Sequence, residues 1–220
     1  MVYRVKNNHD FNGILIGMVL GDSYIGVNKT QTLAYLETLQ KGSHKPYLIW
    51  KQGLINYKFK TTFRYKNNNG YDAFRFRTKL EKKLIYLRKD FYVNGKKTVK
   101  SNILNRLTDL GLAIWYMDDG CLNLGKKNGI INRRNVFLNT QGFGLEGNIL
   151  IQEWLLSKYD ISSNINRNRG FRLRLNTSNT LKLIEIVSPF VELVPCMQYK
   201  IDLKYNLDRK VLENSKRGES

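Results

Sequence analysis

Several features that mark membrane or secreted proteins are scarce in this 220-residue chain. The longest apolar stretch, around residues 14–20, contains glycine and is shorter than the roughly 20 residues that a membrane span requires. Only 2 cysteines are present, Cys121 and Cys196, and although they could form one bridge, a disulfide-stabilised secreted fold usually has more. Residues 1–12 are largely polar and unlike a signal peptide. We therefore expect a soluble, intracellular protein.

Acidic residues are also scarce: 18 Asp and Glu stand against 37 Lys and Arg, which gives a net charge of +19. So large an excess repels itself unless it meets a polyanion, and nucleic acid is the first partner to consider. An anionic membrane surface is the alternative, but membrane binding usually involves one basic tail or amphipathic helix. Here the basic residues occur along the whole chain. A hydrophobic content of 42% indicates a folded protein.

The most apolar stretch, GILIGMVLGDSYIG (13–26), contains an aspartate, Asp22, towards its end. A second stretch, LGLAIWYMDDGCL (111–123), repeats this arrangement with Asp119, 97 residues further on. Two more segment pairs align at nearly the same spacing: FRFR (74–77) with FRLR (171–174), and, with a slip of two, KLIYLRKDF (83–91) with KLIEIVSPF (182–190). The chain therefore reads as two copies of one unit, 1–100 and 101–205, followed by a polar tail, 206–220.

Periodicity predicts the order helix, two strands, helix, two strands, helix in each copy, an α+β fold of two αββαββα halves. In the first copy we expect helices at 11–21, after Ser43 and Pro46, and at 83–91, with strands at 32–40, 60–66 and 71–78. In the second we expect helices around 112–116, at 145–159 and at 182–190, the last capped by Ser178 or Asn179, with strands at 135–141, 161–167 and 171–177.

Alternation within the second hairpin of each copy separates apolar from basic side chains. Phe74 and Phe76 share one face of the strand, and Arg75 and Arg77 share the other. The same pattern places Arg172, Arg174 and Asn176 together in the second copy. An ordinary solvated sheet face is the alternative, but such faces normally mix charges of both signs. Arginine can grip guanine bidentately and a two-stranded ribbon fits the major groove, so these faces are predicted to contact nucleic acid.

Small residues predict that the two apolar helices pack together. Gly13, Gly17 and Gly21 fall on one helical face, and Gly111 with Ala113 provides small residues on the second helix. Asp22 and Asp119 would then emerge side by side. Each could be only a turn residue beside glycine. A carboxylate at the negative end of a helix dipole nevertheless favours a positive partner, and a divalent cation is the simplest one.

The segments LIGMVLGDS (15–23) and LAIWYMDDG (112–120) resemble the two motifs that name the LAGLIDADG homing endonucleases. The first departs from the pattern by carrying Ser23 in place of the final glycine, a variation that leaves Asp22 untouched. The segments NGKKTVKSN (94–102), FLNTQGF (137–143) and VPCMQYK (194–200) also resemble single-chain, two-motif, intron-encoded members of this family. The resemblance covers nearly the whole chain.

The resemblance implies a pseudo-symmetric saddle over duplex DNA, with antiparallel sheets in the major groove and the two motif helices meeting over the minor groove. Asp22 and Asp119 would be catalytic and would bind Mg²⁺, helped by the backbone carbonyls of Gly21 and Asp118. Mn²⁺ would substitute, and Ca²⁺ would bind without supporting cleavage. The chain would act as a monomer without a membrane partner. The residues expected to contact DNA are Arg64, Lys66, Arg75, Arg77, Asn139, Gln141, Arg172, Arg174 and Asn176.

By the same resemblance, one lysine in each half would stabilise charge on the cleaved phosphate. Lys97 and Lys200 are the candidates, with Lys96 and Lys204 as the alternatives. Other nuclease types fit less well, because the 2 histidines, His9 and His44, lie in no His-Asn-His array.

An intron maturase, which binds RNA during splicing, and a transcription factor with a decayed nuclease fold are the rival functions. Both are disfavoured by the two intact aspartates, which RNA or DNA binding alone would not require. Abundant Asn, Lys, Ile and Tyr suggest an AT-rich coding genome, such as that of a mitochondrion or chloroplast.

Overall fold

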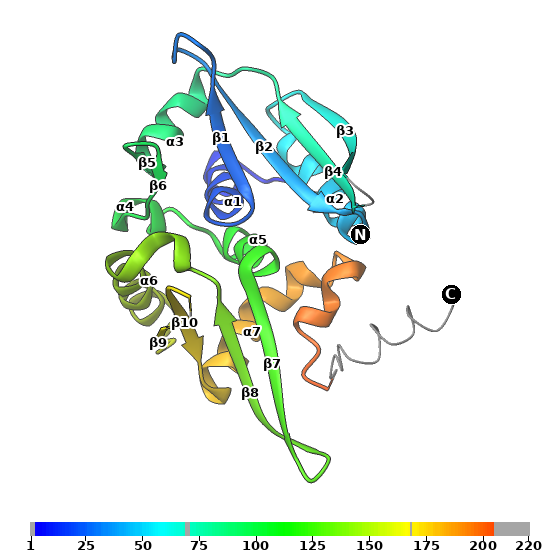
Figure 1. The fold of residues 1–220 in the computed structure, drawn as a ribbon, viewed down its shortest axis with the longest axis vertical. Coiled ribbons are helices and arrows are strands. Elements are labelled where there is room, and N and C mark those ends of the chain that lie inside the picture. The colour runs from blue at the N-terminus through cyan, green and yellow to red at the C-terminus, as the bar shows by residue number, and fades with distance from the viewer. Residues whose placement is uncertain (1–2, 69–70, 168, 205–220) are drawn as a thin grey trace.

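The computed structural model describes residues 3–68, 71–167 and 169–204. The predicted polar tail, 206–220, lies outside the described residues. Two four-stranded antiparallel sheets, each covered by helices, form the framework (Figure 1). This arrangement confirms the predicted α+β class and the repeated αββαββα order.

The first half is built from residues at the N-terminal side of the chain. Its elements are α1 (Asn8–Leu20), β1 (Ser23–Val27), β2 (Ala34–Lys41), η1 (Gly42–His44), α2 (Lys45–Ile55), β3 (Thr61–Asn68), β4 (Tyr71–Thr78), α3 (Lys83–Phe91), β5 (Tyr92–Val93) and β6 (Lys96–Lys97).

The second half repeats this order after the short helix α4 (Ser101–Leu104). Its elements are α5 (Asp109–Asp119), β7 (Gly120–Lys127), β8 (Ile130–Leu138), η2 (Gln141–Phe143), α6 (Gly144–Tyr159), β9 (Asn164–Arg167), β10 (Phe171–Leu175), α7 (Thr177–Val191) and η3 (Pro195–Lys200).

The two sheets have the same topology. Their strand orders are β1-β2-β4-β3 and β7-β8-β10-β9, so the predicted hairpins β3–β4 and β9–β10 are confirmed. The repeated FRFR and FRLR segments occupy β4 and β10, the third strand of each sheet. The first strands, β1 and β7, escaped sequence analysis because Gly26, Gly120 and Gly125 weaken the strand pattern.

Polar caps set where several helices begin. The Asn7 and Thr108 side chains accept hydrogen bonds from backbone N–H groups in the first turns of α1 and α5. The predicted cap of α7 was wrong: Asn176 is the N-cap, and its amide oxygen accepts from the Asn179 backbone N–H at 3.0 Å. The chain leaves β10 directly into α7, so the helix begins earlier than Ser178 or Asn179 would allow.

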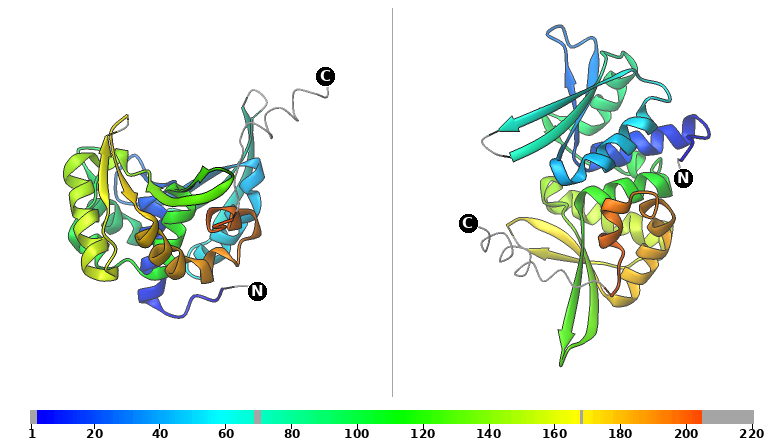
Figure 2. Two further views of the ribbon diagram at one scale, coloured as in Figure 1. Left: turned by 90° about the horizontal axis from the view of Figure 1, so that it is seen from below. Right: turned by 90° about the vertical axis from the view of Figure 1, so that its right-hand side faces the viewer.

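The sheets lie on one side of the molecule and most helices lie on the other (Figure 2). Helices α1 and α5 run side by side between the two sheets (Figure 1), and most of their residues are buried. None of the helices within the described ranges is long and apolar enough to cross a membrane. Cys121 and Cys196 are both free thiols, so no bridge joins them.

Candidate functional site

The site begins at the contact between α1 and α5. A Cβ atom added at Gly17 would lie 2.1 Å from the Gly111 carbonyl oxygen, and one added at Gly111 would lie 2.3 Å from the Gly13 carbonyl oxygen. Only glycine permits this backbone-to-backbone approach. The predicted packing of the two motif helices is therefore confirmed, and it brings their C-terminal ends together.

Three aspartates gather at these helix ends. Asp22 follows α1 and is exposed, whereas Asp118 and Asp119 are the last two residues of α5. The pKa of Asp119 is raised to about 7: burial and the nearby carboxylates of Asp118 and Asp22 raise it, and Lys97 and Lys200 oppose the change. At Asp119, the repulsion from the two neighbouring carboxylates therefore outweighs the attraction of these two lysines.

Lys97 and Lys200 occupy corresponding positions around this cluster. The Lys97 ammonium donates hydrogen bonds to the carbonyl oxygens of Gly21 (3.0 Å) and Ser23 (3.1 Å). The Lys200 ammonium donates to the carbonyl oxygens of Asp118 (3.3 Å) and Gly120 (3.0 Å). Since Gly21 and Asp118 are 97 residues apart, as are Ser23 and Gly120, the two lysines bind carbonyls related by the sequence repeat.

Burial separates these lysines from their sequence neighbours. Burial lowers the pKa of both Lys97 and Lys200, and the three nearby aspartates oppose this change in each case. Lys96 and Lys204, the alternatives that the sequence left open, are exposed. The structure therefore places Lys97 and Lys200 beside the carboxylates. The carbonyl oxygens of Gly21 and Asp118, which were expected to coordinate a metal, accept hydrogen bonds from these two lysines instead.

The structure adds two residues, Gln40 and Lys51, that sequence analysis did not single out. The Gln40 side-chain N–H donates to Asp22 Oδ2 at 2.7 Å and to Asp118 Oδ1 at 3.3 Å. The Lys51 ammonium forms an ion pair with Asp118 Oδ1 at 2.9 Å. Burial raises the pKa of the Asp118 carboxyl, and Lys51 opposes that change. The sequence signal that could have identified Lys51 is its position four residues after Tyr47, which places the lysine on the same face of α2 as a buried aromatic residue.

The basic face of the first sheet is only partly as predicted. Arg64, Arg75 and Arg77 line a small hollow together with Thr62. One acidic residue interrupts this face, because Glu37 on the neighbouring strand contacts Arg77 at 2.6 Å and Arg75 at 3.5 Å. Lys66 belongs to β3, but its side chain lies outside the described residues.

On the second sheet, Arg172 lies over the Phe137 ring, with 4.3 Å between the guanidinium carbon and the ring centre, and donates to the Asn139 amide oxygen at 3.4 Å. Arg174 and Gln141 are partly exposed, and Asn139 is exposed. Asn176 is exposed too, although its amide oxygen caps α7. These side chains remain predicted DNA contacts.

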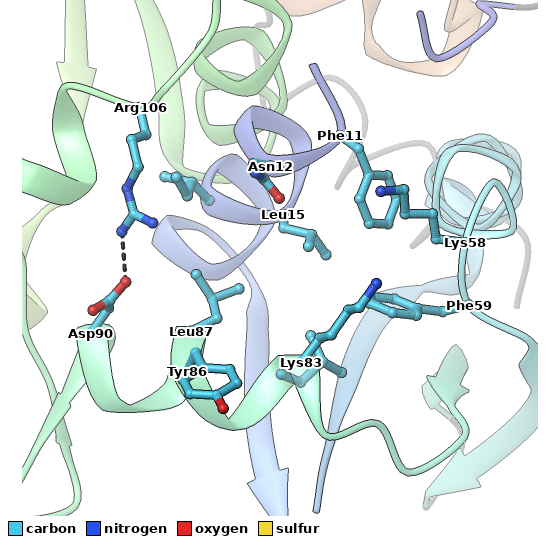
Figure 3. Close-up of a pocket in the computed structure, with 12 residues that line it drawn as sticks. Phe11, Asn12, Leu15, Lys58, Phe59, Lys83, Tyr86, Leu87, Asp90 and Arg106 are labelled. Carbon is cyan, nitrogen blue, oxygen red and sulfur yellow. Dashed lines mark hydrogen bonds and ion pairs between the residues drawn. The ribbon is translucent and has the colours of Figure 1, made fainter. Parts of the chain in front are cut away.

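A separate cavity of about 180 Å³ lies at the N-terminal part of α1, away from the aspartates (Figure 3). Phe11, Leu15, Phe59 and Leu87 contribute apolar surface, and the ion pair between Arg106 and Asp90 lies at one edge (Figure 3). None of the predicted site residues lines it.

The aspartate cluster fits a divalent cation if other oxygen atoms complete the coordination. Within the described ranges, the Asp119 carboxylate accepts no hydrogen bond, although it is partly buried. No group of three or more His, Cys, Asp and Glu side chains in the described part of the chain is arranged to hold a metal by itself. Magnesium typically takes one or two carboxylates and completes its shell with water and substrate phosphate, which matches this donor set.

Comparison with known proteins gives consistent matches. Residues 12–183 match the sequence profile of the LAGLIDADG DNA endonuclease family. The chain is 36% identical over 111 residues to the probable intron-encoded DNA endonuclease 3 of Mycosarcoma maydis, covering 50% of this chain and 75% of that protein. It is 29% identical over 200 residues to the cytochrome b mRNA maturase bI2 of Debaryomyces hansenii, covering 86% and 71%. The homing endonuclease I-WcaI, solved bound to its DNA recognition sequence, superposes with a TM-score of 0.76 at 26% identity, covering 91% of this chain and 88% of that one.

Proposed function

Because this chain belongs to the LAGLIDADG DNA endonuclease family, we propose that it is a site-specific homing endonuclease that binds a long duplex DNA target and hydrolyses both strands. The observation that carries the proposal is the paired arrangement at the ends of α1 and α5. There, Asp22 and Asp119 lie among lysines that bind carbonyls related by the repeat. Two equivalent sets of groups suit a substrate with two equivalent strands.

DNA binding is assigned to the sheet side of the molecule. Arginines of β4 and β10 have the shape and charge to contact phosphates and guanine edges in the major groove. Glu37 limits this at one point, since it orients Arg77 and Arg75 by ion pairing. A carboxylate can also accept a hydrogen bond from a cytosine amino group, so Glu37 adds a means of sequence discrimination.

Catalysis is assigned to the aspartate cluster. Asp22 and Asp119 would hold Mg²⁺, which when bound lowers the pKa of a coordinated water and offsets charge on the phosphate. Lys97 and Lys200 hold the chain in place where α1 passes into β1 and α5 into β7, through their carbonyl hydrogen bonds. Each ammonium would also offer positive charge to the phosphate that is cleaved in its own half. Mn²⁺ would replace Mg²⁺, whereas Ca²⁺ would occupy the site without supporting cleavage.

A second candidate function is suggested by the similarity to a maturase. An RNA-binding role in splicing would use the same basic surface but would not require the aspartates. The endonuclease proposal is favoured because Asp22 and Asp119 are both present, and both lie in the one cluster between the halves.

Selection of cleaved sequences from a randomised duplex library in Mg²⁺ tests the proposal. We expect the protein to enrich a long, partly asymmetric site and to leave both strands cut. Asp22→Asn and Asp119→Asn keep the size of the side chain but remove a charge that holds the metal, so each should reduce cleavage by several orders of magnitude. Undiminished cleavage by either variant would rule out this mechanism, and binding of intron RNA without DNA cleavage by the unaltered protein would favour the maturase.

A further inference from the structure

A fully buried ion pair joins the two halves beside the aspartate cluster. Lys51 lies on α2 in the first half, and Asp118 lies at the end of α5 in the second half. Their charged groups are 2.9 Å apart, and both side chains have 0% of their surface exposed. Burying two charges is unfavourable, and replacing such pairs with apolar residues is often neutral or stabilising. Stability alone is therefore a weak reason for this pair.

Asp118 instead has direct contacts with Asp22. Its Oδ2 atom accepts a hydrogen bond from the Asp22 backbone N–H at 3.2 Å. Its Oδ1 atom shares the Gln40 amide N–H group with Asp22 Oδ2. A Cβ atom at Gly21 would lie 2.5 Å from Asp118 Oδ2, so the glycine before Asp22 is what lets the carboxylate reach the backbone. Asp118 thus holds Asp22 by its main chain and, through Gln40, by its carboxylate.

Lys51 is itself held in one orientation by α2. Its ammonium lies 4.3 Å from the centre of the Tyr47 ring, one helical turn earlier. The Tyr47 hydroxyl donates to the Ile114 carbonyl oxygen at 3.1 Å, one turn before Asp118. The same face of α2 therefore contacts α5 at two points across the boundary between the halves.

The second half has no equivalent support for Asp119 within the described residues. The residue 97 positions before Asp118 is Gly21, which has no side chain. The residue 97 positions after Lys51 is Asn148, which donates to the carbonyl oxygens of Thr140, Gly144 and Phe171 in its own half. The support is therefore specific to Asp22.

We propose that Lys51 and Asp118 are positioning residues that fix Asp22, so that the strand whose cleavage depends on the first half is the more sensitive to their loss. This inference rests on the proposed nuclease function. Lys97 provides an internal reference, because it binds the carbonyls on both sides of Asp22. Variants of the Lys51–Asp118 pair should slow cleavage of the same strand that Lys97→Met affects. Lys200→Met should affect the other strand.

The variants must separate positioning from stability. Asp118→Asn alone leaves the Lys51 charge buried without a partner, so its melting temperature should fall. The double variant Lys51→Met with Asp118→Asn removes both charges at similar volume, and should melt close to the unaltered protein. Asparagine has one acceptor oxygen where aspartate has two, and an amide oxygen is a weaker acceptor than a carboxylate oxygen. The hydrogen bond from the Asp22 N–H is therefore weakened or lost, whereas Gln40 keeps its bond to Asp22 Oδ2. Lys45→Met is the control, since Lys45 is an exposed lysine of the same helix.

One readout does not depend on cleavage. In metal-free, DNA-free protein, hydrogen exchange of the Asp22 amide should be about tenfold faster in the double variant, because its acceptor is weakened. The Asp119 amide, inside α5, should exchange at an unchanged rate. Unchanged exchange at Asp22 would overturn the inference whatever the nuclease assay gives.

The second readout is strand preference on a supercoiled plasmid that contains the selected site. The double variant should cut the affected strand between about tenfold and a hundredfold more slowly, as expected for a small displacement of a reacting group. Equal slowing of both strands with a restored melting temperature would overturn the inference. Faster Asp22 exchange in a protein that cuts no DNA would instead support the placement of Asp22 and refute the nuclease proposal.

Discussion

Two adjacent aspartates at the end of α5 lie in different environments. Asp118 is paired with Lys51 and accepts two further hydrogen bonds, whereas Asp119 accepts none within the described ranges. Neighbouring residues on a helix point in different directions, so one faces α2 and the other faces the cluster. Asp118 is suited to organise structure, and Asp119 is the carboxylate left available for a cation.

The raised pKa of Asp119, about 7 against an ordinary 3.8, predicts a pH-dependent stability without metal. The folded state keeps a proton that the unfolded state releases, so the contribution of Asp119 to the free energy of unfolding is present at low pH and is lost as pH rises through 7. The melting temperature of Asp119→Asn minus that of the unaltered protein should therefore increase as the pH rises from 4 to 8. Thermal melts across this range measure the difference; a constant difference would contradict the raised pKa.

Lys97→Met and Lys200→Met should each slow cleavage mainly on one strand, because each ammonium lies at the helix-to-strand junction of one half. A plasmid assay should show accumulation of nicked circles, with opposite strands nicked by the two variants. Lys96→Met is the matched control, since Lys96 is exposed on the same short strand. If Lys96→Met lost as much cleavage as Lys97→Met, the assignment of Lys97 rather than Lys96 to the phosphate would be contradicted.

At the scale of elements, the contact of α1 with α5 positions the whole cluster. The Asp22 loop and Asp119 come together because two helix backbones touch at Gly17 and Gly111. The sheets then follow directly from these helices, since β1 begins at Ser23 and β7 begins at Gly120. One helix contact therefore sets both the position of the carboxylates and the start of each sheet.

Gly17→Ala tests this contact. The added Cβ would lie 2.1 Å from a backbone oxygen, so the helices must separate, and we expect a loss of about 3 kcal/mol in the free energy of unfolding. Gly53→Ala is the control: it lies in α2 with nothing within 4 Å of the added atom, and should stabilise the protein by about 1 kcal/mol. Chemical denaturation of both variants measures the difference. Equal stability of the two variants would exclude tight packing at Gly17.

Arg75→Ala and Arg172→Ala should weaken DNA binding, because they remove positive charge from β4 and β10. Each lost phosphate contact should also reduce the slope of log K against log salt by about 0.9. Asp22→Asn should bind almost as well as the unaltered protein in the absence of metal. Titrations at several salt concentrations measure these slopes; unchanged slopes in both arginine variants would remove these residues from the interface.

At the scale of the whole molecule, one chain provides both halves of the arrangement. The two sheets lie on the same side of the paired helices (Figure 2), and each half contributes one motif helix to the central contact. The two halves also differ, as the Lys51–Asp118 pair and the ion pairs of Glu37 show. Such differences suit a target whose two half-sites are not identical.

The internal pairing of α1 with α5 predicts a monomer. Sedimentation at micromolar concentration should give a single species near 25.8 kDa. DNA should shift it to a complex with one protein per duplex, since one chain already carries both carboxylates. A stable homodimer in the absence of DNA would contradict the prediction.

Local patterns in the sequence determined the framework of this protein. Strand alternation, helical periodicity and the 97-residue spacing of Asp22 and Asp119 are short-range or repeated signals, so they could be read without coordinates. The glycines of the two apolar helices predicted their contact for the same reason. Even here a boundary failed, because Asn176 rather than Ser178 or Asn179 caps α7.

Only the tertiary structure decided which polar residues surround the aspartates. Gln40 and Lys51 lie on different elements from Asp118, and the positions of Lys97 and Lys200 depend on how β6 and η3 pack against the helix ends. Each is one of many similar residues in the chain, and nothing local distinguishes Lys97 from Lys96 or marks Glu37 as a partner of Arg77. Burial and proximity between distant segments make that distinction, and both arise only when the two halves fold against each other.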